Sequence, residues 1–222
     1  MGCRFTSNLA VDLGRISYGR AYEIQKQLVE LIKEDCRNGF LLFLEHDPVY
    51  TVGRKPIPEN YSAVDVVVTE RGGDVTYHGP GQIVVYPIFL ISEEERIDVR
   101  EYVQFVEKIV IDILEKAGYE AFVGEEPGIW IRTSRGERKV ASIGMAIDHG
   151  ISYHGVSINL TNEAVQGFLK INPCGLDPSV MHYASIPARS VKTEFIKAFA
   201  SRYGEFNEMD AESFLRTLSV FH

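Results

Sequence analysis

The chain has 222 residues, of which 45% are hydrophobic and 24% are charged, proportions that are typical of a globular protein and exclude a disordered or fibrous one. Its 31 acidic and 23 basic residues give a net charge of -8 at pH 7, which argues against nucleic acid or an anionic membrane as the main partner. The three cysteines, Cys3, Cys36 and Cys174, are too few and too widely spaced for a disulfide framework or a structural zinc site. Because the first residues also carry no secretion signal, we expect a reducing, cytoplasmic location and no bound metal.

The first predicted helix covers residues 21–32, where the apolar side chains recur on one face. The apolar run at 40–44 follows it and is typical of a strand that is buried on both faces. The β-branched runs at 66–68 and 83–86 are predicted to be strands of the same kind.

The second predicted helix begins with a capping box formed by Asp98 and Glu101, continues with an apolar stripe from Val99 to Leu114, and ends at Gly118. Short strands with hairpin signals follow at residues 128–131, 140–147 and 151–160, with a turn at 148–150 between the last two. Two more helices are predicted near 191–203 and 211–220. Helices that interleave with hairpin-linked strands indicate an α/β fold with a mixed central sheet, as one domain over residues 1–222.

Cys174 lies in the segment INPCG, between a proline and a glycine. A free cysteine is most often a small buried hydrophobic residue. A Pro-Cys-Gly turn, however, exposes the backbone and is expected to direct N–H groups at a reacting oxygen. Cys174 is therefore a candidate nucleophile.

The stretch RGGDVTYHGPGQ at residues 71–82 contains four glycines and a proline between two predicted strands. It is neither a P-loop nor a dinucleotide-binding loop, because both glycine patterns are absent. Loops at strand ends that mix glycine with polar side chains often contact a ligand. Lys139 and His154, taken alone, have ordinary explanations as a strand-edge lysine and a buried strand histidine.

Together, five segments in this order resemble the lipoyl(octanoyl) transferase family: LEHDPVYTVGR (44–54), RGGDVTYHGPGQ (71–82), KVASIG (139–144), HGVSIN (154–159) and INPCG (171–175). The resemblance implies the fold of biotin and lipoate protein ligases, a mixed sheet flanked by helices. It also implies transfer of an octanoyl group from acyl carrier protein to a lysine of lipoyl domains, which occur in 2-oxo-acid dehydrogenases and the glycine cleavage H protein. No cofactor is expected.

The resemblance also assigns site residues. The family's acyl-enzyme cysteine matches Cys174, and the lysine that favours its thiolate matches Lys139. The implied substrate-binding positions are Arg71, Gly72, Gly73, Asp74, Val75, Thr76, Tyr77, His78, Ser142, Ile143, Gly144, His154, Gly155 and Val156. Two departures stand out: Asp47 replaces a frequent proline, and residues 181–186 match the family poorly but are not expected to touch Cys174 or Lys139.

The chemistry fits a thiol, which attacks a thioester readily and is a good leaving group toward an amine. A neighbouring ammonium favours the thiolate, since a free thiol with a pKa of about 8.5 is only a few per cent ionised at pH 7. We expect acidic partners to dock near the basic residues Arg54, Lys55, Arg71, Arg132, Arg135, Arg138 and Lys139. Alternatives are an ATP-dependent lipoate or biotin ligase, a cysteine hydrolase, and a protein that binds acylated carriers without turnover.

Overall fold

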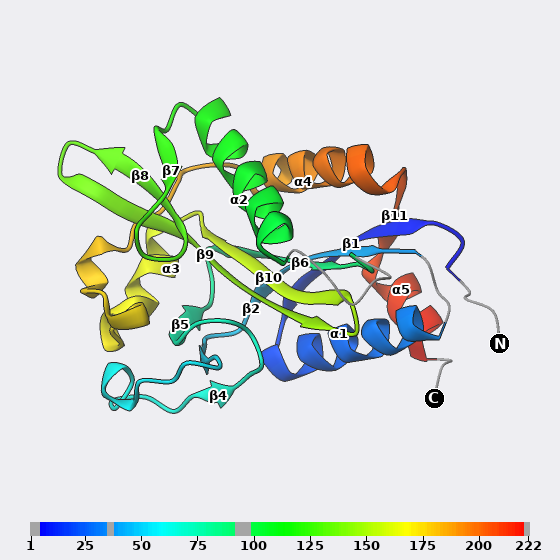
Figure 1. Cartoon of the computed structure of the whole chain (residues 1–222), viewed down its shortest axis with the longest axis horizontal. Helices are drawn as coiled ribbons and strands as arrows, with labels where there is room; N and C mark the ends of the chain where they lie inside the picture. Colours follow the sequence, from blue (N-terminus) through cyan, green and yellow to red (C-terminus); the bar gives the residue numbers. More distant parts are fainter. Residues whose placement is uncertain (1–4, 35–37, 92–98, 220–222) are drawn as a thin grey trace.

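A large mixed sheet and a small sheet of three strands form the frame of the computed structural model, which describes residues 5–34, 38–91 and 99–219 (Figure 1). The strand order is β11-β1-β2-β6-β10-β9-β8-β7 in the large sheet and β4-β3-β5 in the small sheet. The strands are β1 (Asn8–Ile16), β2 (Phe40–His46), β3 (Val49–Val52), β4 (Val67–Val68), β5 (Val75–His78), β6 (Gln82–Ile88), β7 (Ala121–Val123), β8 (Ile129–Thr133), β9 (Gly136–Asp148), β10 (Ile151–Asn159) and β11 (Phe206–Asp210). The helices are α1 (Tyr18–Lys33), α2 (Val99–Lys116), α3 (Asn162–Gln166), α4 (Ala188–Tyr203) and α5 (Ala211–Ser219), with 3₁₀ turns η1 (Pro58–Asn60), η2 (Gly167–Lys170), η3 (Pro173–Gly175) and η4 (Pro178–Val180).

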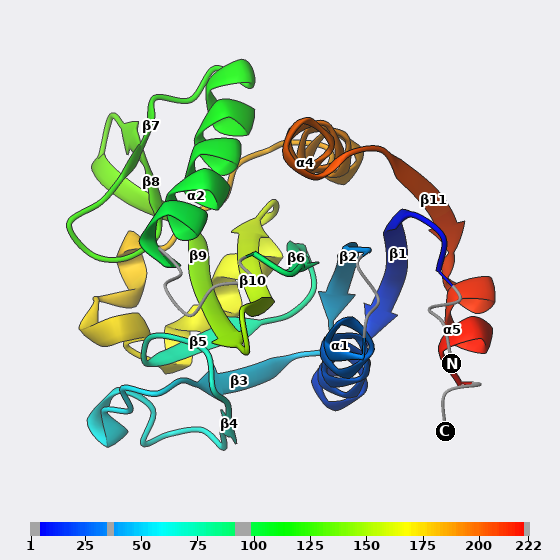
Figure 2. The same ribbon diagram turned by 45° about the vertical axis from the view of Figure 1, so that its right-hand side comes forward.

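The large sheet combines parallel and antiparallel pairing. Strands β11, β1 and β2 run parallel, whereas β2, β6, β10, β9, β8 and β7 pair antiparallel with their neighbours. Helices α2 and α4 lie over one face, and α1 and α5 lie over the other (Figure 2). The predicted mixed sheet flanked by helices is confirmed.

The alternation of side chains along β6 explains why the sheet is buried on both faces. Ile83 and Val85 belong to the apolar cluster under α2 and α4, while Val84 and Tyr86 belong to the cluster under α1 and α5. The runs at 40–44 and 83–86 are buried at every position, so the prediction of doubly buried strands is confirmed for both.

The same prediction is wrong for residues 66–68. Val67 and Val68 form β4 at the edge of the small sheet and are 44% and 79% exposed. Within the described part of the chain they pair with β3 alone, and no described helix lies over them (Figure 1). A β-branched run favours a strand because its side chains fit a pleated sheet, but its burial requires a second layer that this edge lacks.

The predicted helices are confirmed, with small shifts at their ends. Helix α1 begins three residues earlier than predicted, where the Ser17 hydroxyl accepts a hydrogen bond from the Arg20 N–H at 3.4 Å. The predicted cap at Asp98 lies outside the described residues. Val99 at the start of α2 is 41% exposed rather than part of the buried stripe. None of the helices in the described ranges is both long and apolar enough to cross a bilayer.

Candidate active site

Cys174 occupies a strained turn. Its φ of 55° and ψ of 34° place it in the left-handed region, which costs a non-glycine residue on the order of 1–3 kcal/mol and is concentrated at functional sites. The turn is closed by the Gly175 N–H, which donates to the Asn172 carbonyl at 3.0 Å, and by the Leu176 N–H, which donates to the Pro173 carbonyl at 3.1 Å. Because both N–H groups are used within the turn, they are not directed at a reacting oxygen as predicted.

Lys139 lies near the start of β9 and is only 2% exposed. Burial lowers the pKa of its ammonium, and negative charge at Cys174 and at Glu126 raises it in part. This is not the strand-edge lysine that composition alone suggests. Because its pKa is lowered, this buried amine releases a proton more readily than an ordinary lysine.

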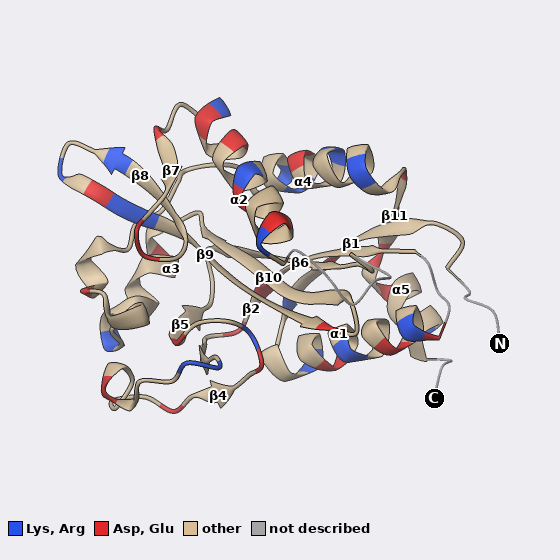
Figure 3. Cartoon of the chain, viewed as in Figure 1, with Lys and Arg blue, Asp and Glu red and all other residues tan. Residues whose placement is uncertain are grey.

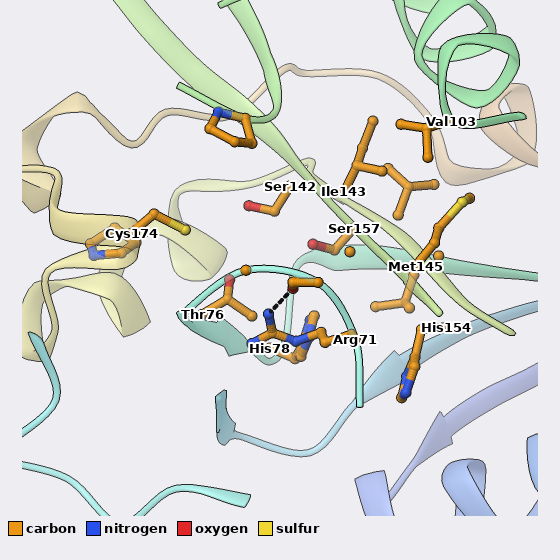
Figure 4. A pocket seen from close by; sticks show the side chains of 18 of the residues that line it. Arg71, Thr76, His78, Val103, Ser142, Ile143, Met145, His154, Ser157 and Cys174 are labelled. Carbon is orange, nitrogen blue, oxygen red and sulfur yellow. Dashed lines mark hydrogen bonds between the residues drawn. The ribbon is translucent and has the colours of Figure 1, made fainter. Parts of the chain in front are cut away.

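Cys174 and Lys139 line one cavity of 340 Å³, together with most of the predicted substrate-binding residues. Those that line it are Arg71, Gly72, Gly73, Val75, Thr76, His78, Ser142, Ile143, Gly144, His154, Gly155 and Val156. In the close view, Cys174 lies at one end, the hydroxyls of Thr76, Ser142 and Ser157 lie along the middle, and Val103 and Met145 lie at the far end (Figure 4). The cavity thus runs from a thiol past polar groups to an apolar end, as an acyl thioester would require.

Thr76 presents a buried hydroxyl to this cavity. The residue is 7% exposed, and its Oγ1 has no hydrogen-bond partner among the described residues. Because a buried hydroxyl without a partner is costly, the free Thr76 group is available to a bound ligand.

Two predicted residues do not line the cavity. The Asp74 carboxylate is turned toward residues 57–60, where it accepts hydrogen bonds from the Ile57 N–H and the Asn60 side chain. Tyr77 follows the alternation of β5 and points to the opposite side from Thr76 and His78, where its ring meets Phe168 edge-on. Direct substrate contact is therefore not supported for either side chain.

The Arg71 guanidinium contributes a buried positive charge. It donates to the Thr51 carbonyl at 2.7 Å, to the Thr51 hydroxyl at 2.9 Å and to the Gly72 carbonyl at 3.0 Å. Burial lowers its pKa, opposed by negative charge on neighbouring groups that include Cys174. No carboxylate of the described residues lies within 4.0 Å of this guanidinium, so its charge is available to an anion that forms in the cavity.

Two histidines that line the cavity, His78 and His154, and the neighbouring His46 are neutral at pH 7. Burial lowers the pKa of His46 and of His154 to about 4, and it lowers that of His78 well below the usual value. His78 Nδ1 donates to Gln82 Oε1 at 2.7 Å, and His46 Nε2 accepts from the Tyr86 hydroxyl at 2.7 Å. Their rings make this part of the site polar but uncharged. Across the described residues, no group of three or more His, Cys, Asp or Glu side chains is placed to hold a metal ion.

The segment at 181–186 contacts Lys139, contrary to the prediction. Met181 pairs with Lys139 in an isolated parallel bridge, and the His182 N–H donates to the Lys139 carbonyl at 2.8 Å. Backbone pairing of this kind does not depend on side-chain identity, so a divergent sequence can still make it. Asp47, the other departure, forms an exposed ion pair with Arg15 at 2.9 Å.

Comparisons with known proteins agree with this geometry. The model of the lipoyl protein ligase A/B catalytic domain matches residues 17–203. An octanoyltransferase of Solibacter usitatus is 38% identical over 211 residues, which cover 90% of this chain and 92% of that protein. The chain belongs to the octanoyltransferase family. The resemblance inferred from the five sequence segments is therefore confirmed.

Ligases share the fold of this octanoyltransferase. A bipartite lipoate protein ligase of Thermoplasma acidophilum superimposes with a TM-score of 0.68 at 16% identity, covering 96% of this chain and 92% of that one. A biotin acetyl coenzyme A carboxylase synthetase of Helicobacter pylori gives a TM-score of 0.51 at 9% identity, covering 96% and 80%. At these identities the likeness shows a common architecture and nothing about the reaction.

Several cavity residues of the octanoyltransferase escaped the sequence analysis. Tyr18, Tyr86 and Ser157 come from regular elements, and Val103 from an apolar stripe, so no sequence signal distinguishes them from core residues. Gly128 was predicted only as the first residue of a strand, but it lies against Lys139. It lies just before β8 with a φ of 129°, and a β-carbon there would lie 2.6 Å from Lys139 Cε.

Proposed function

We propose that the protein transfers an octanoyl group from octanoyl-acyl carrier protein to the acceptor lysine of lipoyl domains, with Cys174 as the covalent carrier. The acceptors are the lipoyl domains of 2-oxo-acid dehydrogenase E2 subunits and the glycine cleavage H protein. The observation that carries this proposal is the strained Cys174 turn, which shares one cavity with the buried amine of Lys139. A reactive thiolate also needs a reducing compartment, which supports the cytoplasm as the place of the reaction.

In the first half of the reaction, the Cys174 thiolate attacks the carbonyl carbon of the donor thioester. The tetrahedral intermediate carries a negative oxygen, which the Thr76 hydroxyl and the buried Arg71 charge would stabilise, since both residues line the cavity. The carbon–sulfur bond of the donor then breaks. The carrier thiolate takes a proton from the Lys139 ammonium and leaves as a thiol.

In the second half, the acceptor lysine must be neutral to attack the Cys174 thioester. Lys139 is now a neutral amine and accepts the proton that the attacking amine loses, so the ammonium is restored. Cys174 leaves as a thiolate, and an amide remains on the acceptor. The lowered pKa of Lys139 supports this exchange, because an ordinary lysine would release its proton too reluctantly at pH 7.

The octanoyl chain itself would lie along the cavity toward Val103 and Met145, away from the thiol (Figure 4). Apolar side chains at this end favour a hydrocarbon, since each buried methylene contributes about 0.8 kcal/mol.

A transferase and a ligase are distinguished by their source of activation. Purified protein, apo-lipoyl domain and octanoyl-acyl carrier protein with EDTA should give an octanoylated lysine, because a thioester is already activated. Free octanoate with ATP and Mg²⁺ should give no product with the same protein. The reverse pattern would assign the chain to the ligases. Free octanoate as the main product of the first mixture would instead indicate a hydrolase.

A further inference from the structure

The Cys174 turn is anchored to a segment far away in the sequence. The Asn172 N–H, at the start of this turn, donates to the Asn60 carbonyl at 2.8 Å. Asn60 ends the short helix η1, and its side-chain nitrogen lies near Gly175 as well, 3.9 Å from where a β-carbon would stand. The position of the turn therefore depends on the position of Asn60.

Asn60 is in turn fixed by a buried carboxylate. Asp74 Oδ2 accepts a hydrogen bond from Asn60 Nδ2 at 2.6 Å, and Asp74 Oδ1 accepts one from the Ile57 N–H at 3.0 Å. The Asp74 side chain is 4% exposed. No lysine or arginine of the described residues forms an ion pair with it within 4.0 Å. Both carboxylate oxygens are thus engaged by the segment that carries Asn60.

The backbone of Asp74 is itself held beside the cavity. The Asp74 carbonyl accepts a hydrogen bond from the Gly53 N–H at 3.3 Å, and the neighbouring Gly73 carbonyl accepts one from the Lys55 N–H at 3.0 Å. Gly73 lines the cavity, and β5 begins at Val75, directly after Asp74. Asp74 therefore links the cavity-lining glycine loop to the segment that supports the nucleophile.

We propose that Asp74 and Asn60 are positioning residues, which hold the Cys174 turn against the cavity through the hydrogen-bonded sequence Asp74, Asn60, Asn172. This inference rests on the proposed role of Cys174 as acyl carrier. It replaces the substrate-binding role that the sequence suggested for Asp74. A displacement of the thiol by a fraction of an ångström would slow the reaction without changing the groups that touch the substrate.

The test uses a substitution that breaks the link and a second one that rebuilds it. Asn60→Asp places a second carboxylate against that of Asp74 and removes the donor. In the double variant, Asn60→Asp with Asp74→Asn, residue 74 donates and residue 60 accepts, so the hydrogen bond is restored with the roles exchanged. Asp177→Asn is the matched control. Its carboxylate caps the Ser179 N–H at 2.8 Å close to the Cys174 turn and forms no hydrogen bond with the described residues of the turn or with Asn60.

Two rates are measured at a temperature where thermal unfolding shows each variant to be folded: alkylation of Cys174 by iodoacetamide, mapped by peptide mass, and octanoyl transfer. We expect Asn60→Asp to lower kcat about 10- to 100-fold with KM changed less than about threefold, and to alter the alkylation rate. The double variant should return both rates to within about threefold of the original protein, and Asp177→Asn should leave them unchanged.

Rates for Asn60→Asp that stay within about twofold of the original protein would overturn the inference. Failure of the double variant to restore them would overturn it too. If the original protein transfers no octanoyl group while the alkylation rates follow the expected pattern, the proposed function fails and the positioning of the turn stands.

Discussion

At the scale of single residues, Cys174 and Lys139 are set apart by conformation and burial rather than by their identity. Cys174 has a positive φ, and Lys139 is a nearly fully buried amine that forms no ion pair within 4.0 Å with a carboxylate of the described residues. Both features cost stability. Such costs are tolerated where a site needs a reactive group in a fixed place.

Lys139 should supply both a charge and a proton acceptor. Lys139→Arg keeps a cation but cannot act as a base, so alkylation of Cys174 at pH 7 should be partly retained while octanoyl transfer falls. Lys139→Ala should lower both, with transfer reduced about 10²- to 10⁴-fold. Exposed Lys170, which lies before the Cys174 turn, provides the control, since Lys170→Ala should change neither rate. An unchanged pH profile of Cys174 alkylation in Lys139→Ala would rule out the pairing.

At the scale of elements, the site depends on contacts between strands and loops. Lys139 on β9 is packed against the backbone just before β8, where a β-carbon on Gly128 would lie 2.6 Å from Lys139 Cε and 2.5 Å from the Ala141 carbonyl oxygen. Glycine is required here for the close approach as well as for the positive φ.

Gly128→Ala should therefore displace Lys139 and lower kcat by more than about tenfold. Gly136→Ala in the same hairpin has similar backbone strain, with a φ of 93°, but among the described residues its β-carbon would approach only the Arg138 side chain, at 3.5 Å. That control should lose about 1 kcal/mol of unfolding free energy and keep its kcat. Equal effects of the two substitutions on kcat, measured at equal folded fractions, would contradict the packing argument.

The sequence predicted which segments form helices and strands better than it predicted how those segments are buried and which way their side chains point. Runs 40–44 and 66–68 look alike as apolar strands, yet one is at the centre of the large sheet and the other at an exposed edge. Most of the predicted site residues line one cavity, but Tyr77 and Asp74 point away from it, because the direction of a side chain depends on strand register and on distant partners. The bond between Asn172 and Asn60 joins segments that no local pattern connects.

At the scale of the whole molecule, the net charge is negative, but basic residues lie near the hairpin of β8 and β9 (Figure 3). Of the basic residues predicted to receive acidic partners, Arg71 and Lys139 are buried in the cavity, and Arg132 is paired with Glu120. Arg54, Lys55 and Arg135 are exposed, Arg138 is part-buried, and none of the four forms an ion pair within 4.0 Å with the described residues. These four are available to an acidic carrier, and the last two belong to the hairpin.

Salt should therefore weaken the donor complex. Raising the salt from about 0.05 to 0.5 M should raise the KM for octanoyl-acyl carrier protein, because screening shortens the range of the attraction. Arg135→Glu together with Arg138→Glu should raise this KM at low salt and leave kcat unchanged. Arg216→Glu on α5, away from the hairpin, serves as control. A KM that is independent of salt would contradict this prediction.

The buried histidines predict how stability depends on pH. Between pH 6.5 and about 4, the unfolded chain protonates His46 and His154 while the folded chain keeps them neutral. The unfolding free energy should thus fall as pH falls through this window, by about 2 kcal/mol for each histidine between pH 7.5 and 5. Denaturant titrations at the two pH values measure the loss. His46→Gln should reduce it.

The measurement that tests the account most directly is the mass of the protein after reaction with octanoyl-acyl carrier protein in the absence of an acceptor. We predict one added octanoyl group, mapped to Cys174 and released to an apo-lipoyl domain at a rate no slower than kcat. Cys174→Ser should take up no label that the acceptor can remove. A Cys174→Ser variant that transfers at the original rate, or a label on Cys3 or Cys36 that alone is discharged to the acceptor, would contradict the account.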